Sequence, residues 1–308
     1  MPTLDSIIVA AALDRRDATT LRHAARLATA LQTRSVGVAH VEPPLDWSAE
    51  LAARAAAAGA PERPVEERLQ RLVQEHRGSF PVAASIQPVM RYGARVAELV
   101  QIAAERTADL LVLGRRPRDE HDGVSDAVVK LEWKAPCSVL IVPEDFPATY
   151  ERILVACDFS EHSREALELA ATLARVTPNS SLIIQHVLSL PASPLMAGRS
   201  VSEFTEMLRD AARERWASFA SSLALDGVRY TLRLDESDHV PQAITRAAVD
   251  VDAQLIVVGS HGLSQRAGAL LGHVADAVCA RTARPFLCVK RRGEVVNLLQ
   301  ALLGLYSR

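Results

Sequence analysis

Residues 152–175, RILVACDFSEHSREALELAATLAR, contain a short apolar run followed by a helical pattern. The run RILVAC (152–157) has the length and the branched residues of a buried strand. Beyond it, apolar residues return every three or four positions, as they do on one face of a helix. They are Ala166, Leu169, Ala170 and Leu173. The stretch therefore predicts a strand followed by a helix over 161–175 that packs against a sheet.

The same alternation of short apolar runs and helical patterns extends along the whole chain. The other strands predicted in the second half are SLIIQHV (181–187), VRYTLRL (228–234), QLIVVG (254–259) and PFLCVK (285–290). Five strands are predicted in the first half: SIIVAA (6–11), SVGVAHV (35–41), VAASIQPVM (82–90), DLLVLG (109–114) and SVLIV (138–142). Their order repeats, which indicates an internal duplication.

Four pairs of residues align the two halves at a nearly constant offset. They are Ile7 with Ile153, His40 with His186, Asp109 with Gln254, and Pro136 with Pro285. A helix over 18–31, with the stripe Leu21, Ala24, Ala25, Ala28 and Leu31, is the first-half counterpart of 161–175.

The strands are continuous apolar runs, which is typical of parallel sheets covered by helices on both faces. The sequence therefore predicts an α/β protein of two tandem, five-stranded, parallel, doubly wound domains. Ligands of such domains bind beyond the carboxyl ends of the strands. We place the first domain at 1–146 and the second at 150–291, joined through EDFPATYER (144–152), with an apolar tail at 292–308.

Composition and charge exclude several function classes. The chain has 35 basic and 37 acidic residues and no basic block, so we expect no nucleic-acid partner. No window is long and apolar enough for a membrane span, and MPTLDSIIVAAALD (1–14) does not resemble an export signal. We expect a cytoplasmic protein without membrane contact.

The sequence contains no recognisable catalytic or metal-binding motif. Cys137, Cys157, Cys279 and Cys288 are scattered, which predicts buried thiols rather than disulfides or a zinc site. A Walker loop, a GxSxG elbow and a kinase set are all absent, so we expect neither an enzyme nor rapid ATP hydrolysis, while slow turnover stays open.

The loop after QLIVV (254–258) is the clearest candidate for ligand binding. It reads Gly259-Ser-His-Gly262, then nine residues, then Gly272-His273-Val274 at the start of a predicted helix. Glycines allow the main chain to approach phosphate closely, and a helix N-terminus presents amides and a positive dipole end. The pattern predicts an anion site made mainly of main chain.

Here the sequence resembles the universal stress proteins, whose ATP-binding members carry G-x2-G-x9-G-[S/T] after the fourth strand. Gly259, Gly262 and Gly272 match all three glycines. ILVACDFS (153–160) and IIQHV (183–187) resemble the first and second strands of the family. Weaker support comes from VGVAHV, RYGARVAELV and DLLVLGRR in the first half.

The resemblance implies Rossmann-like (HUP-type) domains and an adenine nucleotide, ATP with Mg²⁺, in the second one. The implied nucleotide-binding residues are Asp158, Val187, Gly259, Gly262, Gly272, His273 and Val274. It also implies a pseudo-dimer within one chain, formed through the last strands, with a homodimer as a further alternative.

Several residues carry two interpretations. His273 replaces the Ser or Thr of the family, and its imidazole either donates to a phosphate or fills the space of the terminal phosphate. Asp158 is a ligand contact or a turn residue, and Ser160 is a helix N-cap rather than a nucleophile. In helix 200–224, the apolar residues Phe204, Met207, Leu208, Ala211, Trp216 and Phe219 indicate core or a domain seam.

The first half lacks the equivalent ligand pattern. Its loop reads Gly114-Arg-Arg-Pro117, Ala127 replaces the third glycine, and Asp14 is displaced from the position of Asp158. We therefore expect no nucleotide in this half. Arg115, Arg116 and Arg118 are interpreted as a solvated basic loop, with anion binding as the alternative.

Three functions compete. The first is a stress-response protein that binds ATP through its second domain, with a regulatory or protective role. The second is a tandem stress protein without nucleotide that acts through protein–protein contacts. The third, an adenylating enzyme, is disfavoured because an SGGxDS-type loop is absent after the first strand.

Overall fold

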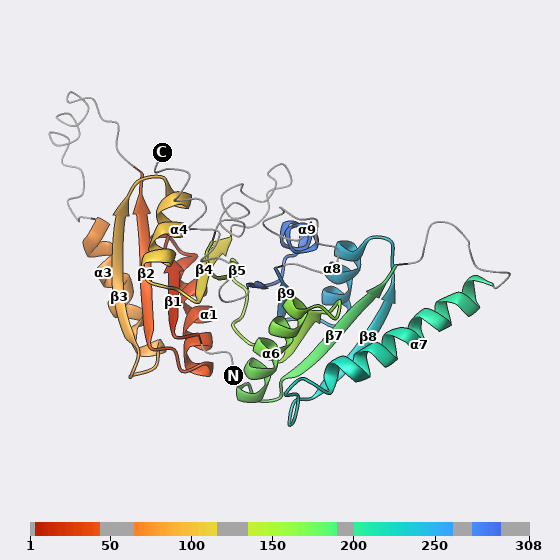
Figure 1. Cartoon of the computed structure of the whole chain (residues 1–308). Helices are drawn as coiled ribbons and strands as arrows, with labels where there is room; N and C mark the ends of the chain where they lie inside the picture. Colours follow the sequence, from red (N-terminus) through yellow and green to blue (C-terminus); the bar gives the residue numbers. More distant parts are fainter. Residues whose placement is uncertain (1–3, 44–64, 116–134, 190–199, 261–272, 291–308) are drawn as a thin grey trace, which may run out of the picture.

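The computed structural model describes residues 4–43, 65–115, 135–189, 200–260 and 273–290 (Figure 1). In the first half the strands are β1 (Ser6–Ala10), β2 (Ser35–Glu42), β3 (Ser85–Tyr92), β4 (Leu110–Arg115) and β5 (Ser138–Pro143). The helices there are α1 (Asp17–Ala30), α3 (Val65–His76) and α4 (Arg95–Glu105), with a 3₁₀ turn η1 (Arg77–Ser79).

The second half repeats this order of elements. Its strands are β6 (Arg152–Ala156), β7 (Ser181–Leu188), β8 (Tyr230–Glu236), β9 (Leu255–Gly259) and β10 (Phe286–Val289). Its helices are α6 (Glu161–Val176), α7 (Val201–Ala220), α8 (Val240–Asp250) and α9 (His273–Arg281). Each of the ten predicted strands is confirmed to within three residues at either end.

All ten strands lie in one sheet, in the order β3-β2-β1-β4-β5-β10-β9-β6-β7-β8 (Figure 1). Neighbours within each half are parallel, which confirms the doubly wound fold class. The halves join through an antiparallel pair, in which Phe286 faces Ile141, Leu287 faces Leu140 and Cys288 faces Val139. The two halves of the chain therefore meet through their last strands, β5 and β10.

The strand registers show that the duplication is structural. Ile7 pairs with Leu110 in the first half as Ile153 pairs with Leu255 in the second. Asp109 accepts the N–H groups of Asp5 and Ser6, as Gln254 accepts those of Glu151 and Arg152. The alignment of Pro136 with Pro285 was wrong by two residues, because the equivalent strand residues are Val139 and Phe286. The lengths of the segments before the two last strands differ, which sequence alignment by proline alone could not detect.

Each face of the sheet carries one continuous core. The first includes Ile7, Leu140, Ile153 and Leu287 under α1, α3, α6 and part of α7, and the second includes Ile8, Val139, Leu154 and Phe286 under α4, α8 and α9. Successive strand residues alternate between these faces, as the period of a strand requires. Both predicted helical stripes, on α1 and α6, are buried. Because each core runs through both halves, the halves stabilise each other.

Helix α7 only partly follows its predicted role in the core. Trp216 and Phe219, near its end, are buried in the first core. Met207 and Ala211 are exposed, so their assignment to the core was wrong. Figure 1 shows α7 running past the β7–β8 end of the sheet, and its first half therefore has less sheet to cover. The predicted domain limits remain a prediction, and the tail at 292–308 lies outside the described residues.

A buried histidine ties α1 to the linker between the halves. His23 is fully buried, its Nδ1 lies 2.7 Å from the hydroxyl of Tyr150, and its Nε2 lies 3.1 Å from the carbonyl oxygen of Phe146. Because a carbonyl only accepts, Nε2 carries the proton and Nδ1 accepts from Tyr150. Burial lowers the pKa of His23 to about 4, with a smaller opposing effect from the Phe146 carbonyl.

The lowered pKa of His23 predicts that the free energy of unfolding decreases in mild acid. The unfolded chain binds a proton near the ordinary His pKa of 6.5, whereas the folded chain does so near 4, so stability is full above 6.5 and falls as pH drops between these values. The expected loss is about 3 kcal/mol. Urea unfolding at pH 7 and pH 4.5 measures it, and His23→Gln is expected to reduce the difference. Replacing the exposed His239 in the same way should leave the difference in place, and an unchanged profile in His23→Gln would contradict the assignment.

Candidate nucleotide site

The second half has a switch point between β6 and β9. These strands are neighbours, with Ile153 opposite Leu255 and Val155 opposite Val257. The chain leaves β6 for β7 on one side and leaves β9 for β10 on the other. A crevice forms beyond the carboxyl ends of such strands because their connections depart in opposite directions. Asp158 follows β6 and Gly259 ends β9, so both predicted site residues lie at this edge.

The turn after β6 is held by its own side chains. Asp158 accepts the N–H of Ser160 through Oδ1 at 3.0 Å, and Ser160 Oγ accepts the N–H of Ser163 at 3.2 Å. Ser160 is thus the N-cap of α6, as predicted. Phe159 between them has a positive φ of 65°, which turns the chain sharply. The half-buried Asp158 has a structural role in this turn and lies at the edge where a ligand contact is expected.

The neighbouring strand β7 contributes Val187 and His186. Val187 is half-buried and packs against the second core. The Nδ1–H of His186 donates to the carbonyl of Cys157 at 2.7 Å, and burial lowers the pKa of this imidazole. The neutral ring stacks on Phe159, with centroids 4.4 Å apart. Val187 thus lies near the end of β7, the neighbour of β6, and Asp158 follows β6.

An aromatic cluster beside the turn was missed from the sequence. Phe159 contacts Phe219 of α7 with centroids 5.7 Å apart, and the guanidinium of Arg215 lies 5.0 Å above the Phe159 ring. Arg164 lies 4.7 Å above Phe219. The helical stripe of α7 signalled Phe219, but nothing in the sequence signalled Phe159, whose partners come from β7 and α7. The cluster fixes the turn that carries Asp158.

Gly259 has a packing reason as well as its predicted place at the phosphate loop. A Cβ at this position would lie 2.7 Å from the carbonyl carbon of His162 and 2.8 Å from its oxygen. Real Cβ atoms essentially never come so close, so β9 and the first turn of α6 meet here only because the residue is glycine. Gly259 thus sets the distance between β9 and α6.

The rest of the predicted phosphate loop is described only where α9 begins. This helix starts at His273, and Val274 packs against the second core. Gly262, Gly272 and the side chain of His273 lie outside the described residues. The helix itself is firmly seated, since Ala275, Val278 and Cys279 are buried.

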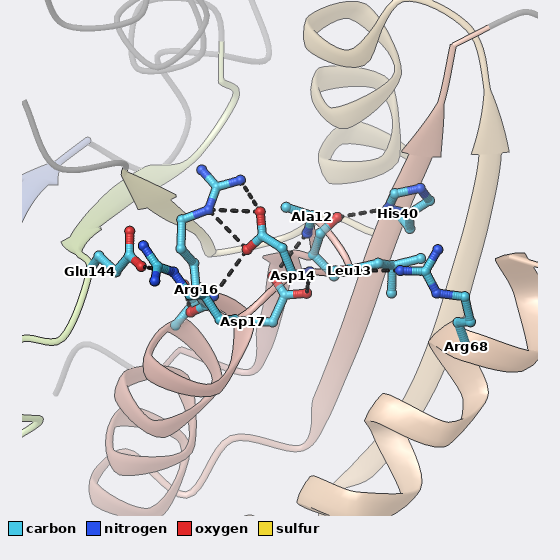
Figure 2. A network of polar contacts seen from close by, with 11 residues as sticks. Ala12, Leu13, Asp14, Arg16, Asp17, His40, Arg68 and Glu144 are labelled. Atoms are coloured by element: carbon cyan, nitrogen blue, oxygen red, sulfur yellow. Dashed lines mark hydrogen bonds and ion pairs between the residues drawn. The ribbon is translucent and has the colours of Figure 1, made fainter. Parts of the chain in front are cut away.

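The corresponding edge of the first half is occupied by an internal polar network (Figure 2). Ala12 stands where Asp158 stands in the second half, because Ala11 and Cys157 donate to equivalent carbonyls and Leu13 repeats the positive φ of Phe159. Asp17 accepts the N–H groups of Ala12 at 2.9 Å and Asp14 at 3.1 Å. Burial raises the pKa of this carboxyl. The displacement of Asp14 from the family position is confirmed.

Further charged side chains complete this network. Arg16 pairs with Asp14, and this hydrogen bond raises the pKa of the guanidinium. Arg15 pairs with Glu144 at 2.6 Å, and Arg68 donates to the carbonyl of Leu13 at 3.0 Å (Figure 2). His40 Nε2 lies 2.9 Å from Glu42. The polar groups at this edge of the first half therefore have partners within the protein.

The interpretation of Arg115 as part of a solvated loop was wrong. Arg115 ends β4 and is half-buried, and it donates across to the second half, to the carbonyl of Cys279 at 2.9 Å and to that of Thr282. Arg116 and Arg118 lie outside the described residues. The acceptors lie 164 and 167 positions away in sequence, so no local pattern could have shown this contact.

The cysteines follow the prediction of buried thiols rather than disulfides. All four are buried and none is in a disulfide, and burial raises the pKa of Cys137 to about 12 and that of Cys157 to about 11. Within the described ranges, no three His, Cys, Asp or Glu side chains come together as a metal cluster. In that same part of the chain, no helix is long and apolar enough to cross a membrane.

A comparison with family models decides the relationship. The model described as the universal stress protein family matches residues 3–143 and, a second time, residues 149–290. The chain belongs to the universal stress protein family. The two matches correspond to the two halves of the sheet, so it carries the family domain twice in tandem.

Individual family members cover either one half or the whole chain. The universal stress protein MJ0577 of Methanocaldococcus jannaschii is 26% identical over 159 residues, which are 47% of this chain and 98% of that protein. A putative universal stress protein from Pseudomonas aeruginosa UCBPP-PA14 is 21% identical, with a TM-score of 0.68 over 97% of both chains. One from Archaeoglobus fulgidus DSM 4304 is 16% identical, with a TM-score of 0.63 over 94% of this chain and 97% of that chain. The two structures share the tandem fold.

Proposed function

We propose that this universal stress protein binds an adenine nucleotide, ATP with Mg²⁺, through its second domain, and acts in regulation or protection rather than catalysis. The observation that carries the proposal is the meeting of three predicted site elements at one edge of the sheet. Asp158 follows β6, Val187 lies near the end of adjacent β7, and Gly259 ends adjacent β9. The start of α9 at His273 and Val274 completes the set, together with Gly262 and Gly272 from the sequence.

The chemistry of this edge suits a phosphate chain. The first turn of an α-helix has amides without partners inside the helix and the positive end of its dipole, and both attract phosphate oxygens. Mg²⁺ retains water and binds phosphate oxygens, so it would need few protein ligands here. When bound, the ion neutralises part of the phosphate charge. The main chain of the loop and α9 orients the phosphates.

The first domain is proposed as the partner in an intramolecular pseudo-dimer that binds no nucleotide. The β5–β10 pair and the shared cores support this arrangement. Its own strand-end edge is taken up by the contacts of Asp17, Arg16 and Arg68. A cytoplasmic location belongs to the same proposal.

A second candidate function is protein–protein contact without nucleotide. The observation that favours it is the exposed apolar surface at the start of α7, where Val201 and Met207 are 57% and 47% exposed. The replacement of the family Ser or Thr by His273 also favours this function, because the hydroxyl of the family motif is absent. Nucleotide released from the purified protein by denaturation, identified by absorbance and mass, separates the two functions.

Isothermal titration with ATP and Mg²⁺ tests the first function directly. We expect saturable heat with the intact chain, and about tenfold or more weaker binding in Asp158→Ala, because a charge-assisted contact is lost. Asp210→Ala is the matched control, since this carboxylate pairs only with neighbouring Arg213 on the exposed face of α7 in the described contacts. Absence of heat from the intact chain at high concentration would contradict nucleotide binding, and equal affinities in both variants would remove Asp158 from the site.

A further inference from the structure

The end of β4 in the first half reaches the last turn of α9 in the second. The guanidinium of Arg115 donates through one Nη to the carbonyl of Cys279 at 2.9 Å and through the other to the carbonyl of Thr282. The last carbonyls of a helix have no partner within it and form the negative end of its dipole. A planar guanidinium with two donors is well suited to cap them, and its half-buried position strengthens both bonds.

Helix α9 is also the element that begins directly after the predicted phosphate loop. Its nine residues span about 13 Å, so its two ends move together as one short rod. One side is fixed in the core by Ala275, Val278 and Cys279. The bonds from Arg115 fix the C-terminal end, and the orientation of the first amides at His273 depends on both restraints.

We propose that Arg115 is a positioning residue for the nucleotide site, through which the first domain sets the orientation of α9. The proposal rests on the proposed function of the second domain. It assigns the first domain a regulatory part, because a change that breaks the two bonds of Arg115 reaches the helix that faces the phosphates. The end of β4 in the first domain thus acts on the site of the second domain.

A contact to the equivalent acceptor on the other side of the β5–β10 pair provides a comparison, although its donor comes from a different strand. Lys290, which follows β10, donates through Nζ to the carbonyl of Ala135 at 2.8 Å. Ala135 and Thr282 each lie four residues before equivalent strand positions, Val139 and Phe286. Both halves therefore receive a cation at the same place, but only Arg115 makes two bonds to the end of α9. Removing Lys290 disturbs the seam without removing the cap of α9.

Hydrogen exchange and nucleotide titration on the full chain test the proposal together. In Arg115→Ala we expect amide exchange over 273–282 to rise about tenfold or more without nucleotide, and ATP affinity to fall about tenfold. Arg115→Lys should give an intermediate effect on both, because the charge remains and one bond is lost. Arg115→Met keeps the aliphatic stem and replaces the alanine variant if that variant fails to fold.

Two controls separate positioning from loss of stability or charge. Lys290→Met is expected to raise exchange around Ala135 and to leave 273–282 unchanged. Arg91→Ala on β3 removes an exposed ion pair with Glu105 of α4 and should change neither readout. Unchanged exchange over 273–282 in Arg115→Ala overturns the positioning of α9. Increased exchange with unchanged affinity for ATP overturns its link to the site. If the unmodified chain binds no ATP, the proposed function fails, and the exchange result alone still decides whether Arg115 holds α9.

Discussion

Replacing Gly259 with valine is expected to abolish nucleotide binding and to lower the stability of the whole chain. The new Cβ would overlap the carbonyl carbon and oxygen of His162, which lie 2.7 and 2.8 Å from its position. Main-chain atoms at the start of a helix cannot move aside as a side chain can. The turn that carries Asp158 and the end of β9 must therefore separate, and the site opens.

For the milder variant Gly259→Ala, the loss in free energy of unfolding can be stated as a number. We expect a loss of about 1–3 kcal/mol from overpacking, measured by urea unfolding, with weakened ATP binding in the titration. The matched control is Gly114→Ala at the equivalent end of β4, where the Cβ would meet the hydroxyl of Thr20 at 2.7 Å. That hydroxyl can rotate, so a smaller loss and unchanged ATP affinity are expected. Full ATP binding by Gly259→Val would show that the spacing of β9 and α6 does not shape the site.

Phe286→Ala is expected to destabilise both halves at once, by about 3–5 kcal/mol. The Phe286 side chain is fully buried and opposes Ile141 in the antiparallel pair that joins the halves. It belongs to the core that also contains Leu111 and Val139 of the first half and Ile256 of the second. A cavity there removes contacts from both domains.

Thermal and urea unfolding followed by hydrogen exchange measure this effect. Hydrogen exchange should increase in β4 and β9 alike, because these strands are the direct neighbours of β5 and β10, which join the two halves. Phe204→Ala on α7, where the side chain is only half-buried, is the matched control and should cost much less. If one half kept its stability while the other unfolded separately, the shared core would not couple the two domains.

Local patterns predicted the inner strands well because each of them shows its burial within a few residues. β2, β7 and β9 appear as continuous apolar runs in the sequence and are buried in the sheet. Ser160 was also predictable as the N-cap, since capping depends on residues three positions apart. Helix α7 shows where a local pattern is insufficient. Its apolar stripe includes Met207, which is exposed, because burial of that turn also depends on whether the helix lies over the sheet there.

The sequence predicted which residues belong to the candidate site, but not which contacts hold those residues in place. Asp158, Val187 and Gly259 follow or end strands, and parallel strands bring such residues to one edge. The ring of Phe159 on His186 and the contact of Gly259 with His162 required side chains from separate elements to meet. A glycine in the sequence indicates that the main chain is free to adopt unusual conformations or close contacts. The residue that requires glycine at position 259 is His162, which is far away in sequence.

The sequence by itself determined that this protein is a duplicated α/β chain of parallel strands, because periodicity and repetition are properties of short segments. Only the tertiary structure decided that the two halves form one sheet through β5 and β10, and that Arg115 holds the end of α9. Both contacts join segments more than a hundred residues apart. The groups that form these contacts meet only after the chain has folded, so the residues adjacent in sequence give no indication of the contacts.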